Sequence, residues 1–316
     1  MVGQKIDKAA EILRQGGLVA IPTETVYGLA ANALDSSAVL KIFEAKNRPS
    51  FDPLIVHVGE AKDVHIYAQN IPKVALRLMD SFWPGPLTFI LEKKALIPDE
   101  VTSGHSTVGL RMPDHPIALS ILKSLNFPLA APSANPFGYV SPTSAEHVSQ
   151  QLNDKVDYIL DGGRSAVGVE STIIAFEGEE VVVLRLGGIE VEAIEKVLGK
   201  KVLKVKTSSS NPKAPGMLDS HYNPGKKVIM VDDIRAELQK YKGRMDVGAL
   251  TFSLQDWADN TWVPLTKKAD IKEAAKNLFH SLRLLDHDTI QLIIAERVPD
   301  TGLGPAINDR LKRASV

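Results

Sequence analysis

The chain has 316 residues, of which 44% are hydrophobic and 24% are charged, and its net charge is −1. This length favours two domains, and this composition is typical of a globular protein with a sizeable core. The near-zero charge argues against a protein whose whole surface clamps nucleic acid, although a local basic pocket is compatible with it. The absence of cysteine excludes disulfides, thiolate metal sites and a cysteine nucleophile.

The N-terminal stretch lacks the apolar segment of a signal peptide. No run approaches the roughly 18 apolar residues that a membrane span needs. We therefore expect a cytoplasmic protein that makes no membrane contact.

Predicted strands and helices alternate along the first two thirds of the chain. Strands are expected at 18–21, 54–58, 87–91, 108–112, 127–131, 156–160, 171–176 and 181–186. Helices are expected from Ile6 to Leu13, from a cap at Asp35 to near Asn47, and over 72–82, 116–125, 144–152 and 189–198. The stretch 22–33 is interpreted as a loop. This alternation predicts an α/β or mixed α+β sheet.

The composition changes after Val205. Residues 206–227 are rich in Ser, Pro, Gly and Asn, which indicates a linker or an ordered loop. Beyond it, strands are expected at 227–231, 247–252 and 289–295, and helices at 232–242, at 269–285 and from Pro305. We predict one domain over 1–205, a linker over 206–227 and a smaller βα domain over 228–316.

The stretch "EAKNRPSFDPL" sets Lys46 and Arg48 between a helix and a strand. Such cations can converge on phosphate oxygens. An isolated K-x-R motif, however, more often consists of two surface cations exposed to solvent. Arg111 lies in an apolar strand, where a buried guanidinium needs an anionic partner. That partner could be a protein carboxylate such as Asp114, or the carboxylate of a ligand.

Further polar residues lie at strand ends and in loops, where α/β proteins place their ligands. They are Thr25, His57, Ser133, Asn135, Ser141, Thr143, Ser171 and Arg185. Each also has an ordinary structural explanation, as a turn residue, a helix cap or a satisfied histidine. The sequence has no P-loop, no dinucleotide fingerprint and no recognisable metal motif.

The order of the segments is more informative than any one of them. The ordered segments are "IPTETVYGLAANA", "KNRPSFDPLIVHV", "WPGPLTFIL", "VGLRMPDHP", "APSANPFG", "GVESTII" and "LRLGG". Over about residues 8–200 they closely resemble the Sua5/YrdC family of L-threonylcarbamoyladenylate synthases. The remainder, with "GLGPAINDRLKRAS" near its end, is similar to the additional domain of the long two-domain Sua5 form. The resemblance implies a YrdC-like twisted mixed sheet with helices and a smaller Rossmann-like C-terminal domain.

The resemblance also implies a reaction. Members of the family condense L-threonine, bicarbonate and ATP to threonylcarbamoyl-AMP and pyrophosphate, for threonylcarbamoylation of adenosine 37 in tRNAs that read ANN codons. A Mg²⁺ ion is expected with ATP, held mainly by phosphates and water, so that it needs no metal motif. A tRNA threonylcarbamoyl transferase complex is the expected downstream partner, and a weak contact with tRNA itself is compatible with the charge.

Site residues follow from the resemblance position by position. Lys46 and Arg48 match the K-x-R motif and are the expected catalytic residues. Residues expected at ATP are Lys46, Arg48, Asp52, Thr107, Asn135, Ser141 or Thr143, Arg185, His221 and Tyr222. Residues expected at threonine are Thr25, His57, Arg111, Ser133 and Ser171. Leu218, Asp219 and Ser220 depart from the basic or aromatic residues that the family more often has there.

Two other functions remain open at this point. An RNA-binding module without catalysis is one, and a relative that transfers a carbamoyl group from carbamoyl phosphate is the other. The second usually carries acylphosphatase and zinc-finger domains, whereas here the resemblance begins near Met1 and cysteine is absent.

Overall fold

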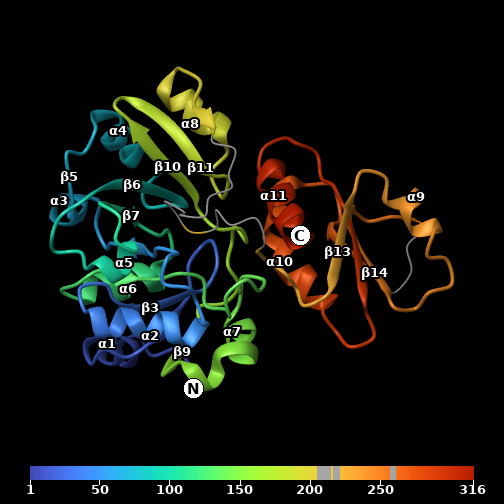
Figure 1. The fold of residues 1–316 in the computed structure, drawn as a ribbon, viewed down its shortest axis with the longest axis horizontal. Helices are drawn as coiled ribbons and strands as arrows, with labels where there is room; N and C mark the ends of the chain where they lie inside the picture. The colour runs from blue at the N-terminus through green and yellow to red at the C-terminus, as the bar shows by residue number, and fades with distance from the viewer. Residues whose placement is uncertain (205–214, 216–220, 257–260) are drawn as a thin grey trace.

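The structure is a computed structural model that describes residues 1–204, 215, 221–256 and 261–316. Figure 1 shows a larger body, coloured blue to yellow, and a smaller orange-to-red body beside it. Helices α10 (Ile271–Leu284) and α11 (Gly304–Ala314) of the smaller body face the larger one.

A mixed sheet of twelve described strands forms the larger body, in the order β1-β9-β2-β3-β8-β4-β7-β6-β10-β11-β12, with β5 paired to β6. The strands are β1 (Val2–Gly3), β2 (Val19–Ile21), β3 (Gly28–Asn32), β4 (Ile55–His57), β5 (Ala68–Gln69), β6 (Leu87–Lys93), β7 (Thr107–Arg111), β8 (Leu129–Ala130), β9 (Tyr158–Leu160), β10 (Thr172–Glu177), β11 (Glu180–Arg185) and β12 (Leu203–Lys204). Parallel and antiparallel neighbours alternate irregularly, so the predicted mixed sheet is confirmed.

Helices pack against both faces of this sheet. They are α1 (Ile6–Arg14), α2 (Ser36–Lys46), α3 (Val64–Tyr67), α4 (Lys73–Phe82), α5 (Asp99–Thr102), α6 (Pro116–Ser124), α7 (Ala145–Leu152) and α8 (Val191–Leu198), with short 3₁₀ turns at Ala61–Asp63 and Asn153–Lys155. Every strand and helix predicted before residue 205 is present, with ends shifted by no more than about two residues. The short elements β1, β5, β12, α3 and α5 were not predicted.

Helix α2 ends where the sequence indicated. The Asp35 side chain accepts hydrogen bonds from the backbone N–H groups of Ser37 and Ala38, which caps the helix start. Asn47 ends the helix in the left-handed conformation at φ 51°, and Pro49 then opposes further helix. Lys46 is therefore the last helical residue, and Arg48 follows directly on the exit from the helix.

The interpretation of 22–33 as a loop is wrong for its second half. Residues 28–32 form β3, which pairs antiparallel with both β2 and β8. "GLAAN" has low intrinsic strand propensity, so its burial between two neighbours overrides the local preference. Gly28 suits this close pairing, because an added Cβ would lie 3.2 Å from the Cβ of Ala131, just after β8, which is a tight contact.

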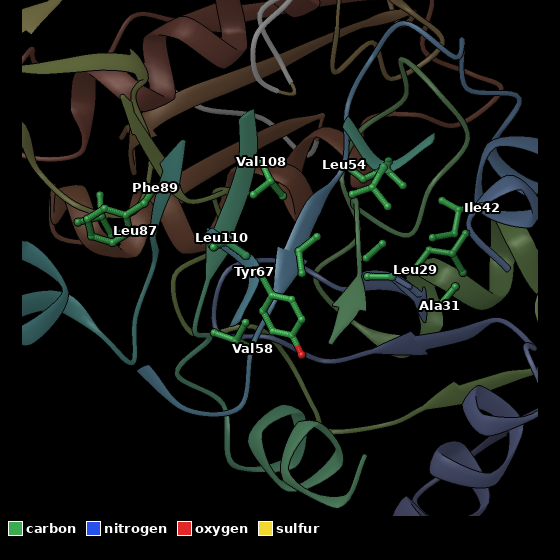
Figure 2. Packing of buried hydrophobic residues seen from close by; sticks show 14 of the residues in the cluster. Leu29, Ala31, Ile42, Leu54, Val58, Tyr67, Leu87, Phe89, Val108 and Leu110 are labelled. Carbon is green, nitrogen blue, oxygen red and sulfur yellow. The ribbon is translucent and has the colours of Figure 1, made fainter. Parts of the chain in front are cut away.

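The core of the larger body lies beneath this part of the sheet (Figure 2). Leu29 and Ala31 of β3 pack with Ile42 of α2, and Leu54 and Leu110 continue the same cluster. All five are 1% exposed or less, so the strands that precede the functional loops rest on a well-packed base.

The smaller body is a four-stranded parallel sheet with strand order β13-β16-β14-β15. Its strands are β13 (Lys227–Val231), β14 (Val247–Ser253), β15 (Trp262–Thr266) and β16 (Leu292–Glu296), and helix α9 (Ile234–Gln239) accompanies α10 and α11. Strand β15 was not predicted, because Pro264 argues against a central strand; at the sheet edge, its missing N–H is tolerated. The predicted segment 206–227 lies mostly outside the described residues.

The two bodies share a hydrophobic cluster. Val26, Val140 and Val169 of the larger body pack in one cluster with Tyr222 and Phe279. Of the helices in the described part of the chain, none has the length and apolar character needed to cross a membrane.

Candidate active site

A cavity of about 50 Å³ lies where loops of the large sheet meet the smaller body. It is lined by Thr25, Val26, Arg48, Ile55, His57, Arg111, Ala131, Pro132, Ser133, Glu170, Ser171, Arg185, Pro215, His221 and Tyr222. Most of the site residues predicted from the sequence are therefore brought together. Lys46, Asp52, Thr107, Asn135, Ser141 and Thr143 are not among the lining residues.

Arg111 ends β7 and is 4% exposed. Its Nη2 atom lies 2.6 Å from Glu24 Oε1, and its Nε donates to the carbonyl of Gly85 over 3.4 Å. The suggestion of Asp114 as its protein partner is wrong, because Asp114 is exposed beyond the strand end. Both Glu24 oxygens and Arg111 Nη2 lack a hydrogen bond of good geometry to the described residues. The Arg111 N–H groups can therefore still donate to another acceptor, and the Glu24 oxygens can still accept.

His57 lies beside Arg111 because β4 and β7 are parallel and pair these two residues. Its Nδ1 is 3.3 Å from the carbonyl of Ile55. Burial, together with the nearby Arg111 charge, lowers the pKa of His57 to about 3. The imidazole is therefore neutral at neutral pH and adds no charge beside Arg111.

Two hydroxyls and a second arginine complete this wall of the cavity. Thr25 Oγ1 lies 2.9 Å from the hydroxyl of Thr23, and Ser171 Oγ lies 2.8 Å from that of Thr88. Arg185, at the end of β11, donates from Nε and Nη2 to the Ser171 carbonyl and from Nη2 to Ser171 Oγ. Its Nη1 donates to the carbonyl of Pro215 over 3.2 Å. The segment before β10 is thus fixed to the end of β11.

Lys46 and Arg48 are buried, not solvated, with 1% and 8% exposure. Lys46 Nζ donates to the carbonyl oxygens of Ser133 and Asn135. Arg48 donates to the carbonyl of Asp52, and its Nη2 lies 2.9 Å from Asp52 Oδ2. Burial, with Arg48 close by, lowers the pKa of Lys46 well below its usual value despite the opposing effect of Asp52. A phosphate beside it would favour the charged form.

The loop 133–143 connects these cations to the rest of the site. Asn135 Nδ2 donates to the carbonyls of Pro136 and Tyr139, and its buried Oδ1 has no hydrogen bond to the described residues. Ser141 Oγ donates to Glu170, a residue that lines the cavity, over 2.6 Å. Thr143 Oγ1 instead lies 3.4 Å from His147 Nδ1 in α7. Of the two alternatives, Ser141 is the one whose hydroxyl bonds to a residue of the cavity lining.

Thr107 begins the strand that Arg111 ends, on the same face, because alternate strand residues share a face. Four steps of strand rise separate the two Cα atoms by about 13 Å. A ligand would have to extend along β7 to meet both residues.

His221 and Tyr222 line the cavity from the C-terminal part of the predicted linker 206–227. The His221 ring lies edge-on to Phe137 at 6.0 Å and to Tyr222 at 4.0 Å. Tyr222 has φ 65° and stacks on Phe279 of α10 at 5.4 Å. Burial lowers the pKa of His221 to about 3 and raises that of Tyr222 to about 12. Residues 218–220, where the sequence departs from the family pattern, lie outside the described residues.

Comparison with known proteins identifies the family to which the chain belongs. Residues 11–187 match the Sua5, YciO and YrdC family model, described as "Telomere recombination", and residues 189–316 match "Threonylcarbamoyl-AMP synthase, C-terminal domain". This chain belongs to the Sua5/YrdC family.

Relatives within this family match the chain over nearly its whole length. A threonylcarbamoyl-AMP synthase of Pyrococcus abyssi is 43% identical, with 98% of this chain and 94% of the relative covered. The Bacillus subtilis enzyme of the same name is 42% identical over 98% and 93%. The crystal structure of Pyrococcus abyssi Sua5 complexed with L-threonine superposes with a TM-score of 0.92 at 40% identity, covering 100% and 97% of the two chains.

Two carboxylates of this Sua5/YrdC site were not singled out in the sequence. Glu24 pairs with Arg111, and Glu170 lines the cavity between Ser141 and Arg310 of α11. Both lie inside the matched segments "PTETVYGL" and "GVESTII". Their position in those segments was a signal, but a single sequence does not show that they are buried.

Proposed function

We propose that this chain condenses L-threonine, bicarbonate and ATP to threonylcarbamoyl-AMP and pyrophosphate, as its relatives' name indicates. The observation that carries the proposal is the convergence of one polar wall and three cations on a single buried cavity. Arg111, His57, Thr25 and Ser171 suit an amino acid, and Arg48 and Arg185 in the same lining suit a triphosphate.

The threonine end of the pocket is expected to be built around Arg111. Its guanidinium can fork the threonine carboxylate, and the Thr25 or Ser171 hydroxyl can pair with the threonine hydroxyl. Because His57 is neutral, it can accept or donate a hydrogen bond without competing for the carboxylate.

At the nucleotide end, Lys46, Arg48 and Arg185 are expected to exchange their present carbonyl partners for phosphate oxygens. The threonine amine attacks the bicarbonate carbon, water leaves, and the resulting carbamate oxygen attacks the α-phosphorus as pyrophosphate departs. Such a displacement depends on alignment and charge neutralisation, and it needs no protein nucleophile. We expect Lys46, Arg48 and Arg185 to offset the charge of the phosphates.

Magnesium fits this site as a companion of ATP and not as a resident of the protein. Among the described residues, no group of three or more histidine or acidic side chains is arranged to hold a metal ion. Phosphate oxygens and water are the ligands that Mg²⁺ prefers, and the ion would supply further charge neutralisation when bound. Asp52, which pairs with Arg48 and whose Oδ1 has no hydrogen bond to the described residues, would have an oxygen free to approach it.

The cavity must widen when the nucleotide enters. About 50 Å³ is room for a few water molecules, which is much less than a nucleotide occupies. Lys46 and Arg48 can exchange their carbonyl partners for phosphate oxygens, and this exchange would create space at the same time. The product would then serve a tRNA threonylcarbamoyl transferase complex in the cytoplasm.

The test is product formation by the full-length chain. ATP, L-threonine, bicarbonate and Mg²⁺ are incubated together and in mixtures that each omit one component, and pyrophosphate and the adenylate are measured by mass spectrometry. We expect the adenylate only in the complete mixture. An RNA-binding module would yield none. A carbamoyl-transfer relative would also yield none here, and would react only when carbamoyl phosphate replaces bicarbonate.

A further inference from the structure

One arginine of the smaller body lies at its junction with the pocket. Arg310 is 0% exposed, and its Nε and Nη2 atoms each donate to Glu170 Oε2 over 3.1 Å. Its Nη1 atom donates to the carbonyl of Leu186 over 2.6 Å, and its guanidinium lies 5.4 Å from the ring centre of Tyr222. The planar fork of arginine suits several fixed partners at once, which a lysine does not.

Arg310 Nη1 also donates to Asp309 of its own helix over 3.2 Å, and its other partners lie on the cavity wall or next to it. Glu170 lines the cavity and precedes Ser171, and Tyr222 also lines it. Leu186 directly follows Arg185, whose own fork fixes Ser171. Arg310 itself is not among the lining residues. One side chain from the smaller body therefore holds three parts of the wall.

The carboxylate of Glu170 depends on this arrangement. Burial by itself raises its pKa, but Arg310, Arg185 and the hydrogen bond from Ser141 outweigh burial, and the pKa is lowered. Removing Arg310 would take one cation away from the buried Glu170 carboxylate, which lies beside the predicted substrate residue Ser171.

We propose that Arg310 is a positioning residue for the reaction, and that the C-terminal domain completes the substrate pocket through it. The inference rests on the proposed function, and it assigns Arg310 no contact with substrate. Arg310 acts through Glu170, Leu186 and Tyr222, which set the places of Ser171 and Arg185.

The first test compares two variants of the full-length protein at the same domain junction. Arg310→Lys keeps the charge but cannot reproduce the fork, and we expect the KM for L-threonine and for ATP each to rise at least about tenfold. Asp286→Asn is the matched control, because Asp286 accepts a hydrogen bond from Tyr139 across the junction without lining the cavity. Its KM values should stay within about twofold of the wild-type values.

A second test asks whether Arg310 acts through Glu170. Glu170→Gln is measured alone and combined with Arg310→Lys. Since the two groups form one unit, the double variant should raise each KM by less than the product of the single effects. An effect equal to that product contradicts the proposal.

Calorimetric L-threonine affinity separates this inference from the proposed function. If the wild type makes no adenylate, the proposed function fails, while weaker threonine binding by Arg310→Lys still supports positioning. Wild-type KM values and affinity in a folded Arg310→Lys protein would overturn the inference, as would a loss of active protein with both KM values unchanged. If Arg310→Lys does not fold, Glu170→Gln alone decides, and wild-type KM values in that variant overturn the inference.

Discussion

Two hollows in the described part of the chain are lined by basic residues, and they differ in how their cations are held. In the pocket of the large sheet, Arg48, Arg111 and Arg185 are each less than 10% exposed and contact carboxylates or carbonyls. A hollow of about 410 Å³ in the smaller body is lined by Arg235, Lys242 and Arg244, beside Tyr241 and Trp262. There, Arg244 pairs with Asp246 at 49% and 37% side-chain exposure.

This difference teaches that size and charge alone do not locate a site. Exposed ion pairs contribute little, because water screens them, whereas buried cations with fixed partners are costly to keep. A buried cation that can exchange a carbonyl for a ligand oxygen is already held in position. Binding an anion there therefore costs little further loss of side-chain entropy. The smaller cavity, with its buried arginines, is therefore the better candidate for the active site, and the predictions below test that contrast.

The largest effect is expected at Arg111. Arg111→Met removes the fork for the threonine carboxylate, so kcat/KM for L-threonine should fall more than about a hundredfold. It also leaves Glu24 unpaired, which should cost about 3–5 kcal/mol of unfolding free energy. Steady-state kinetics and urea unfolding measure the two effects. Arg14→Met, at a half-exposed pair with Glu11, is the control, and an equal response from both variants would contradict the assignment.

Buried His57 is expected to make the protein less stable as the pH falls below neutral. Its pKa is about 3 when folded and about 6.5 when unfolded, so the unfolded chain binds the extra proton as the pH falls below 6.5. Lowering the pH from about 7.5 to about 5 should therefore remove about 2 kcal/mol of stability through this residue. His57→Asn should lack that part of the pH dependence in urea unfolding, whereas His287→Asn, at an exposed position of the smaller body, should keep it.

Lys46→Ala and Arg48→Ala should each reduce adenylate formation at least about tenfold with the fold intact. Pyrophosphate release measures the effect, and circular dichroism checks the fold. Lys41→Ala is the matched control, because Lys41 is an exposed cation on the same helix. Wild-type rates in both the Lys46 and the Arg48 variant would contradict the proposal that "EAKNRPSFDPL" binds phosphate.

The smallest effect is expected in the smaller body. Arg244→Ala breaks a half-exposed ion pair, so the unfolding free energy should change by less than about 1 kcal/mol. Product formation should be unchanged. A loss of activity comparable to that of the Arg48 variant would show that the larger hollow takes part in the reaction.

Much of the fold was predictable because its signals are local. The Asp35 cap, the left-handed Asn47 and Pro49 fix helix α2 within a few residues of chain, and so they also fix Lys46 and Arg48. Strands β3 and β15 were missed because small residues and a proline oppose strand formation locally, and only their places in the sheets make strands of them.

The site was predictable only in part, for a related reason. Arg111 was recognisable as a buried cation, but its partner Glu24 lies 87 residues earlier, and periodicity does not reveal such a pair. The contact between Glu170 and Arg310 spans 140 residues and both family-model regions. Long-range pairs of this kind follow from the folded arrangement and not from any local pattern.

The most direct test is a crystal structure of the chain with L-threonine and a non-hydrolysable ATP analogue. We predict that the threonine carboxylate lies within hydrogen-bonding distance of Arg111 and that the triphosphate contacts Arg48, Lys46 or Arg185. Threonine or nucleotide bound instead in the hollow of Arg235, Lys242 and Arg244 would contradict the account.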